Sequence, residues 1–201
     1  MTAHSANIPR ITIQSIGGSL LLMALFTMMW TGIAQGGLAG RDHYLVLIFF
    51  ASLSATFVCY GIKLFITARR FPKFTTAADK AMAKAILRRY GIIFGAEFTA
   101  IPVVAGLLFM TGYQQFVLPA MALIIGLHFY PMAKVFNRTI DYYIATWTIL
   151  CALVSIWLVN NPGYAPGFFL SFLGIGVALA TSTYGLYMLF DANRLTRKSQ
   201  Q

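Results

Sequence analysis

Charged residues are scarce in this sequence. Only 10% of its 201 residues are charged, whereas 59% are hydrophobic. A soluble globular domain is about a quarter charged, because its surface must be covered by polar groups. So few charges cannot cover a surface in water, which indicates that lipid surrounds much of the chain. The length suits one compact helical bundle, and we expect a single transmembrane domain over residues 1–201.

Cysteines and catalytic motifs are also scarce. The two cysteines, Cys59 and Cys151, lie inside apolar runs and in no zinc or CxxC spacing, so we interpret both as small core residues. The sequence contains no HExxH, GxSxG, Walker loop or GxGxxG. No helix carries two histidines for haem or a di-metal centre. We therefore expect no metal and no cofactor, and an enzymatic role is disfavoured.

What the sequence has in abundance is long apolar runs. A membrane-spanning helix needs about 20 mostly apolar residues. Six runs qualify, at about residues 13–37, 45–67, 90–111, 115–136, 142–159 and 167–190. The runs are continuous rather than alternating, which is typical of helices and not of membrane barrels. The sequence predicts an all-α integral membrane bundle of six transmembrane helices.

The net charge of +10 is distributed unevenly along the chain. Basic residues fall on every second loop, and Arg41 alone lies on the other side. The basic side carries Arg10, Arg69, Arg70, Lys73, Lys80, Lys84, Arg88, Arg89, Lys134, Arg138, Arg194, Arg197 and Lys198. Lys and Arg accumulate on cytoplasmic loops, so we predict that both termini and the loop 68–89 are cytoplasmic, in a cell (inner or plasma) membrane. Orientation alone accounts for the basicity, and no nucleic-acid partner is expected.

Aromatic residues support this orientation. Tyr and Trp concentrate at the two membrane–water interfaces. Five of them are expected toward the outer interface: Trp30, Tyr44, Tyr113, Trp157 and Tyr164.

The basic loop is predicted to contain an amphipathic helical segment that runs into helix three. Lys80, Lys84 and Arg88 recur every four residues along one face, and small apolar residues occupy the other. Such a segment is suited to lie against anionic headgroups, with Lys80, Lys84, Arg88 and Arg89 as the lipid contacts. A solvated extension is the alternative.

Two glycine pairs have the spacing of helix-contact motifs. They are Gly32-x-x-x-Gly36 and Gly91-x-x-x-Gly95. We expect these faces to pack within the bundle, against a second copy of the chain, or against a membrane partner.

Three ionisable residues fall inside the predicted spans: Lys63, Glu97 and His128. A charge at the centre of a membrane helix costs about 2.5–3.5 kcal/mol, so each is a candidate functional residue. The long stem of Lys63 can carry its charge to the headgroups. Glu97 is too short for that, and its depth matches that of His128. The two are predicted to be partners.

Two prolines adjoin this predicted pair. Pro102 removes a backbone hydrogen bond beside Glu97, and Pro131 removes one beside His128. Interrupted helices with polar groups at mid-membrane are how many transporters build their sites. The alternative is a Glu–His or Glu–Lys pair that only locks helix packing.

Further polar side chains lie at the same depth. Tyr60 and Tyr184, together with Lys63, are predicted to line a cytoplasmic vestibule leading to the Glu97–His128 centre.

The stretch Gly126-Leu127-His128-Phe129-Tyr130-Pro131, followed by Tyr142-Tyr143, resembles a group of uncharacterised bacterial multi-helix membrane proteins. These proteins show a similar Gly-x-His-x-x-Pro on a late transmembrane helix. The resemblance implies a bacterial inner-membrane setting and draws attention to His128. It brings no known activity.

Three functions follow from these observations. The first is a small-solute or proton-linked transporter, or a channel-like protein, centred on Glu97 and His128. The second is a non-catalytic accessory, assembly or immunity-type membrane protein, which the small size and the glycine-rich faces favour. The third is a lipid-acting membrane enzyme recruited through the basic loop, for which the sequence shows no nucleophile or metal set.

Overall fold

The computed structural model describes residues 9–71, 77–161 and 163–198, and all regular structure in these ranges is helical. The helices are α1 (Arg10–Leu38), α2 (Leu45–Ala68), α3 (Ala77–Met110), the short 3-10 helix η1 (Gln114–Phe116), α4 (Val117–Phe136), α5 (Thr139–Val159) and α6 (Pro166–Lys198). Six of the described helices are long and apolar enough to cross a membrane, which confirms the predicted all-α bundle. Lys73 lies outside the described residues, as do the side chains of Arg197 and Lys198.

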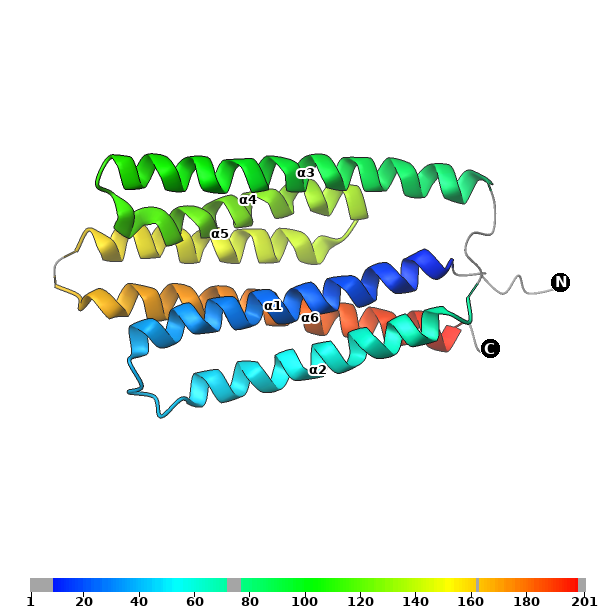
Figure 1. Cartoon of the computed structure of the whole chain (residues 1–201), viewed down its shortest axis with the longest axis horizontal. Helices are drawn as coiled ribbons and strands as arrows, with labels where there is room; N and C mark the ends of the chain where they lie inside the picture. The colour runs from blue at the N-terminus through cyan, green and yellow to red at the C-terminus, as the bar shows by residue number, and fades with distance from the viewer. Residues whose placement is uncertain (1–8, 72–76, 162, 199–201) are drawn as a thin grey trace.

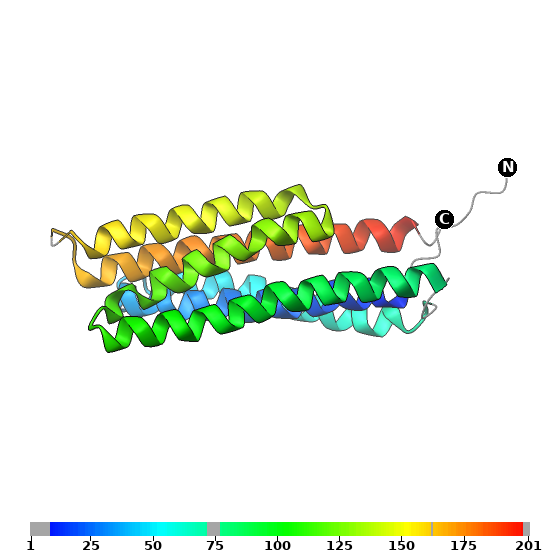
Figure 2. The same ribbon diagram turned by 90° about the horizontal axis from the view of Figure 1, so that it is seen from above.

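The helices pack side by side in the order α2, α1, α6, α5, α4, α3 (Figure 1). The described chain begins and ends at one end of the bundle, which we call the terminal end; the opposite end is the far end. Figures 1 and 2 show that the turn between α4 and α5 stops short of the terminal end, while α3 and α6 continue past it. Because α2 and α3 stand at opposite ends of this packing order, these two edges of the bundle are well separated.

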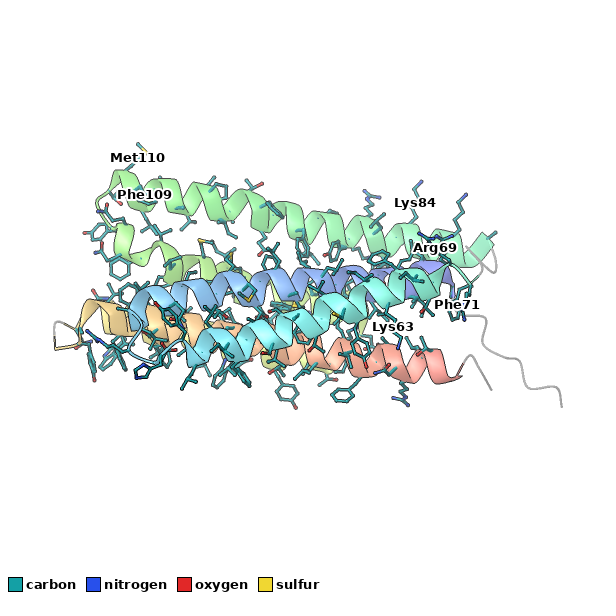
Figure 3. All side chains as sticks on the ribbon, turned by 60° about the horizontal axis from the view of Figure 1, so that its bottom comes forward. Lys63, Arg69, Phe71, Lys84, Phe109 and Met110 are labelled. Carbon is teal, nitrogen blue, oxygen red and sulfur yellow. The ribbon has the colours of Figure 1, made fainter. Side chains whose placement is uncertain are left out.

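Helix α3 is longer than the membrane core. Its 34 residues correspond to roughly 51 Å at 1.5 Å per residue, against about 30 Å of hydrocarbon. One end must project from the hydrocarbon region, and the terminal end carries Lys80, Lys84, Arg88 and Arg89, all exposed (Lys84 is labelled in Figure 3). The basic segment is thus the beginning of α3 itself, which starts at Ala77 rather than near residue 90.

The closest helix contact joins α1 and α6 through glycines. A Cβ atom placed on Gly174 of α6 would lie 2.5 Å from the backbone nitrogen of Ala34 and 2.6 Å from the carbonyl oxygen of Trp30. Gly37 and Gly167 face each other in the same way nearer the far end. Only a hydrogen atom fits at these positions, so the two backbones can touch, as small residues allow in membrane helices.

The glycine pairs singled out from the sequence do not make such contacts. A Cβ atom on Gly32, Gly36, Gly91 or Gly95 would meet nothing within 4 Å among the described residues. The expected packing of these motifs within the bundle is therefore wrong. Contact with a second copy or a partner remains a prediction.

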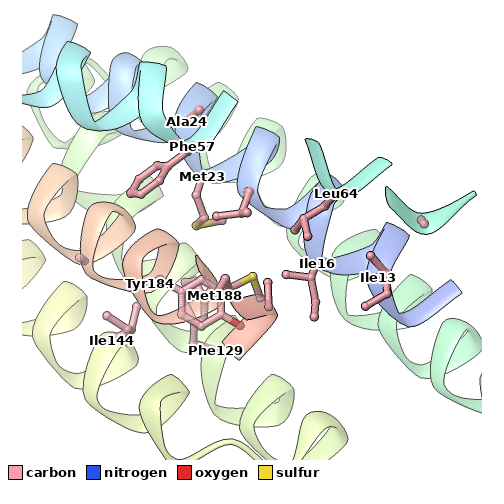
Figure 4. Close-up of a cluster of buried hydrophobic side chains, with 14 of the residues drawn as sticks. Ile13, Ile16, Met23, Ala24, Phe57, Leu64, Phe129, Ile144, Tyr184 and Met188 are labelled. Atoms are coloured by element: carbon pink, nitrogen blue, oxygen red, sulfur yellow. The ribbon is translucent and has the colours of Figure 1, made fainter. Parts of the chain in front are cut away.

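The interior consists mainly of apolar side chains from α1, α2, α4, α5 and α6. Figure 4 shows the larger cluster, in which Phe57, Met23, Tyr184 and Met188 pack together. Trp30 is only 1% exposed and belongs to a second cluster, so it packs inside the bundle rather than on the lipid-facing surface.

The two cysteines have different environments. Cys151 is buried, as expected of a core residue, but Cys59 is exposed on α2, so the core interpretation is wrong for Cys59. Neither is in a disulfide.

The outer surface of the bundle is largely apolar. Phe98 is 74% exposed and Met110, at the far end of α3 in Figure 3, is 86% exposed. Water does not tolerate apolar side chains exposed in such number around a monomer, whereas lipid does. The chain is a multi-pass membrane protein.

Candidate functional site

Glu97 and His128 meet between α3 and α4. Glu97 Oε2 lies 3.5 Å from His128 Nδ1, and each side chain is 10% exposed. Neither atom makes a hydrogen bond with another described residue. The structure thus brings together the two ionisable residues whose pairing was predicted from their depth.

The pair lies at the wall of a hollow of about 350 Å³. The other lining residues are apolar: Ile92, Ile93, Ala96, Ala100, Ile124, Leu127 and Pro131. In such a poorly polarisable setting, a charge without a partner is costly. A carboxyl beside an imidazole and a carboxylate beside an imidazolium both have zero net charge, so the pair can hold one proton without that cost. Gain or loss of a proton leaves a net charge, which a bound ion or a structural change must compensate.

Aromatic rings separate the pair from the terminal end. The Phe94 ring packs edge-on against the imidazole of His128, with centroids 5.5 Å apart. Tyr90 follows at 4.4 Å from Phe94 and 6.1 Å from Phe136. The side of the pair toward the terminal end is therefore packed with aromatic rings.

Helix α3 is well placed to move relative to α4. It packs mainly against α4 and η1, and no residue in its most apolar stretch is buried. Pro102 lies within α3 and Pro131 within α4, one turn from His128. Proline removes a backbone hydrogen bond in a helix interior and so weakens the helix locally. Little packing is lost if α3 shifts, and the Glu97–His128 contact is a polar link that such a shift would break.

Lys63 and Tyr60 do not reach this site. Both are on α2, which packs against α1 and α6 at the opposite edge of the bundle from α3 (Lys63 is labelled in Figure 3). Lys63 is exposed, and its Nζ lies 5.5 Å from the centre of the Tyr60 ring. The structure therefore does not bring Lys63 and Tyr60 into one vestibule with Glu97.

Tyr184 belongs to a second polar cluster between α5 and α6. Its hydroxyl accepts a hydrogen bond from Arg138 Nη1 at 3.4 Å, and its ring packs edge-on against Phe129 with centroids 5.6 Å apart. Asp141 lies beside both Tyr184 and Arg138 and is completely buried. The cluster therefore joins the beginning of α5 to α6.

Sequence reasoning missed Asp141. The expected helix began at residue 142, which left Asp141 in a loop, whereas α5 begins at Thr139. An acidic residue in the first turn of a helix is a recognised start signal and could have moved the boundary.

The four basic residues predicted to contact anionic lipid are exposed near the terminal end of α3. In the described part of the chain, no group of three or more His, Cys, Asp and Glu side chains could hold a metal ion.

The fold and the site define the class: a helical multi-pass membrane protein with a Glu–His pair between two of its helices. No protein-family model, curated protein or solved structure gives a significant match to the chain. The similarity around His128 to bacterial membrane proteins stays a prediction.

Proposed function

We propose that the chain is a proton-linked transporter of a small solute, with Glu97 and His128 as its proton-binding centre. The observation that supports this most directly is the 3.5 Å contact between two ionisable side chains of different helices at an apolar hollow. A packing contact in lipid does not require ionisable groups, because small residues and hydroxyls stabilise helix pairs at lower cost.

Alternation of access would come from movement of α3 against α4. Protonation changes the net charge of the pair, and so changes the free energy of holding the two helices together in a low-dielectric hollow. The neighbouring prolines and the sparse packing of α3 make this edge of the bundle the one that shifts most easily.

We further propose that both termini face the cytoplasm of a bacterial cell membrane. The basic residues at the terminal end, against Arg41 alone at the far end, support this orientation. A cytoplasm-dependent reporter fused to the C-terminus should be active, and an inactive reporter with a normally inserted fusion would reverse the assignment.

The function is tested with purified protein in vesicles that contain a pH-sensitive dye. Small solutes are added one at a time, and an imposed membrane potential should drive proton movement through the wild type when the transported solute is present. Glu97→Gln and His128→Ala should each abolish this movement. Lys63→Gln is the matched control, because it removes a charge from an exposed position on α2 and should leave the flux unchanged. Thermal unfolding of all variants shows whether they are folded. Undiminished flux in both site variants would defeat the proposal.

The exposed glycine face of α3 favours a second candidate function, that of an accessory protein which binds a partner helix. Gly91 and Gly95 lie open on a helix that is sparsely packed in this chain. In that case the wild type moves no protons, and Gly95→Leu prevents copurification of the partner while the chain stays folded.

A further inference from the structure

A second hollow lies near the far end, between α5 and α6, away from the Glu97–His128 pair. Its volume is about 470 Å³. Its walls include Phe168, Phe172, Ile175 and Leu179 of α6 and Trp147 of α5. We call this hollow the α5–α6 groove.

The groove has the length of one membrane leaflet. From Phe168 to Leu179, its walls follow α6 for 11 residue steps, or roughly 16 Å. Half of the hydrocarbon core is about 15 Å. Trp147 donates its indole N–H to the carbonyl of Gly176 at 2.8 Å, so its only donor is satisfied and its ring forms part of an apolar wall. The groove is suited to an acyl chain.

Aromatic rings place the mouth of the groove at the membrane surface. Tyr164 stacks on Phe168 with centroids 5.5 Å apart, and Trp157 lies 5.7 Å from Tyr164. All three side chains are exposed. Exposed Trp and Tyr at the end of a span are typical of the headgroup level.

Arg41 lies at the mouth and has no acidic partner among the described residues. The adjacent Asp42 is already engaged: its Oδ2 accepts hydrogen bonds from Gln35 Nε2 at 3.1 Å and from the Val46 N–H at 3.0 Å, and its Oδ1 accepts from the Tyr44 N–H at 3.3 Å. Desolvation acts to raise the pKa of Asp42, but these hydrogen bonds outweigh it and hold the pKa below its ordinary value. The guanidinium of Arg41 is therefore left for another anion, and its planar donors match the oxygens of a phosphate.

We propose that the α5–α6 groove binds an anionic glycerophospholipid, with one acyl chain between Trp147 and Leu179 and the phosphate on Arg41. The wall is apolar over one leaflet, the mouth is at headgroup level, and the guanidinium there has no carboxylate partner. A neutral lipid would fill the same groove, but its phosphate is already balanced by its own cationic headgroup, so the charge of Arg41 would not be neutralised. The site is independent of the proton-binding pair.

The test measures quenching of Trp147 fluorescence in vesicles of phosphatidylcholine. A minor fraction of the lipid is replaced by a lipid with brominated acyl chains, either phosphatidylglycerol or phosphatidylcholine. The fluorescence of Trp147 is taken as the difference between the wild type and Trp147→Phe. We expect the brominated anionic lipid to quench at about a fivefold lower concentration than the neutral one, the effect of one basic side chain near an anionic headgroup.

Matched variants separate charge from shape. Arg41→Gln should remove the preference, and Arg41→Lys should keep most of it. Ala165→Phe narrows the groove and should reduce quenching by both lipids, whereas Ala55→Phe makes the same change on the lipid-facing side of α2 and should have no effect.

Equal quenching by the two lipids in the wild type, or an unchanged preference in Arg41→Gln, would overturn the proposal. So would protection of Trp147 from both lipids, which would mean that a second copy or another protein covers the groove.

Discussion

The contact between α1 and α6 can be tested with one added methyl group. At Gly174, a Cβ atom would lie 2.5 Å from the Ala34 nitrogen, 2.6 Å from the Trp30 oxygen and 2.7 Å from the Ala34 Cα. All three are backbone atoms, which cannot rotate away, so the helices must separate. At Gly32 of α1, the same Cβ atom would meet nothing within 4 Å.

The two glycines therefore form a matched pair. Replacement of an interior helical glycine by alanine gains about 1 kcal/mol of helix propensity at either position. This term cancels in the comparison and leaves the cost of overpacking. Overpacking costs about 1–3 kcal/mol, and rigid backbone neighbours place Gly174 at the upper end, about 3 kcal/mol. For a chain of this size, that corresponds to a difference in Tm of roughly 6–12 °C.

The assay is thermal unfolding of Gly174→Ala and Gly32→Ala in the same detergent, followed by the intrinsic tryptophan fluorescence, to which the buried Trp30 contributes. We expect Gly32→Ala to equal or exceed the wild type and Gly174→Ala to unfold well below it. Equal stability of the two variants would refute the close approach of α1 and α6.

Three further predictions concern polar groups. Thr27→Val removes the 2.8 Å hydrogen bond to Thr181 and should lower the free energy of unfolding by about 0.6–1.7 kcal/mol, as found for interhelical hydrogen bonds in membranes. In a double-mutant cycle, adding Thr181→Val should cause no further loss of free energy of unfolding. Asp141→Ala removes the buried carboxylate that lies beside Tyr184 and Arg138 and leaves Arg138 without a nearby anion among the described residues, so it should lower the free energy of SDS-induced unfolding by about 1–3 kcal/mol. An unchanged or higher free energy of unfolding would show that this carboxylate does not help to hold α5 against α6. Because the pKa of Asp42 is lowered in the folded chain, its contribution to stability should be present above its ordinary pKa and be lost as the pH falls through the lower, folded value. Asp42→Asn should therefore lower the Tm at neutral pH and have no effect in strong acid, and a deficit that persists in acid would show that the charge is not responsible.

Depth in the membrane could be predicted from sequence, but lateral position could not. Glu97 and His128 share a depth, and α3 and α4 are joined by a short turn, so the helices are adjacent and the side chains meet at 3.5 Å. Tyr60 is expected at the same depth, and Lys63 nearer the cytoplasm, but both lie on α2, at the other edge of the bundle. Position along a span follows from counting residues, whereas neighbours depend on how the helices pack.

The roles of individual glycines followed the same pattern. Gly32 and Gly36 have the spacing of a contact motif but face open space. Gly37 and Gly174 were not part of any predicted motif, yet they make the closest backbone contacts between α1 and α6. Spacing describes one helix, and a contact requires the facing residue on another.

By itself, the amino-acid sequence determined that this protein crosses the membrane as six helices, because lipid requires long apolar runs whose backbone hydrogen bonds close within each segment. It also predicted that Glu97 and His128 lie at a similar depth, and it contains the uneven distribution of basic residues. Only the tertiary structure decided that α1 and α6 form the centre, that α3 is a sparsely packed edge, and that Asp141 is buried beside Tyr184. The physical reason is that lipid and neighbouring helices are almost equally apolar, so the hydrophobic pattern of a span carries little information about which face meets which partner.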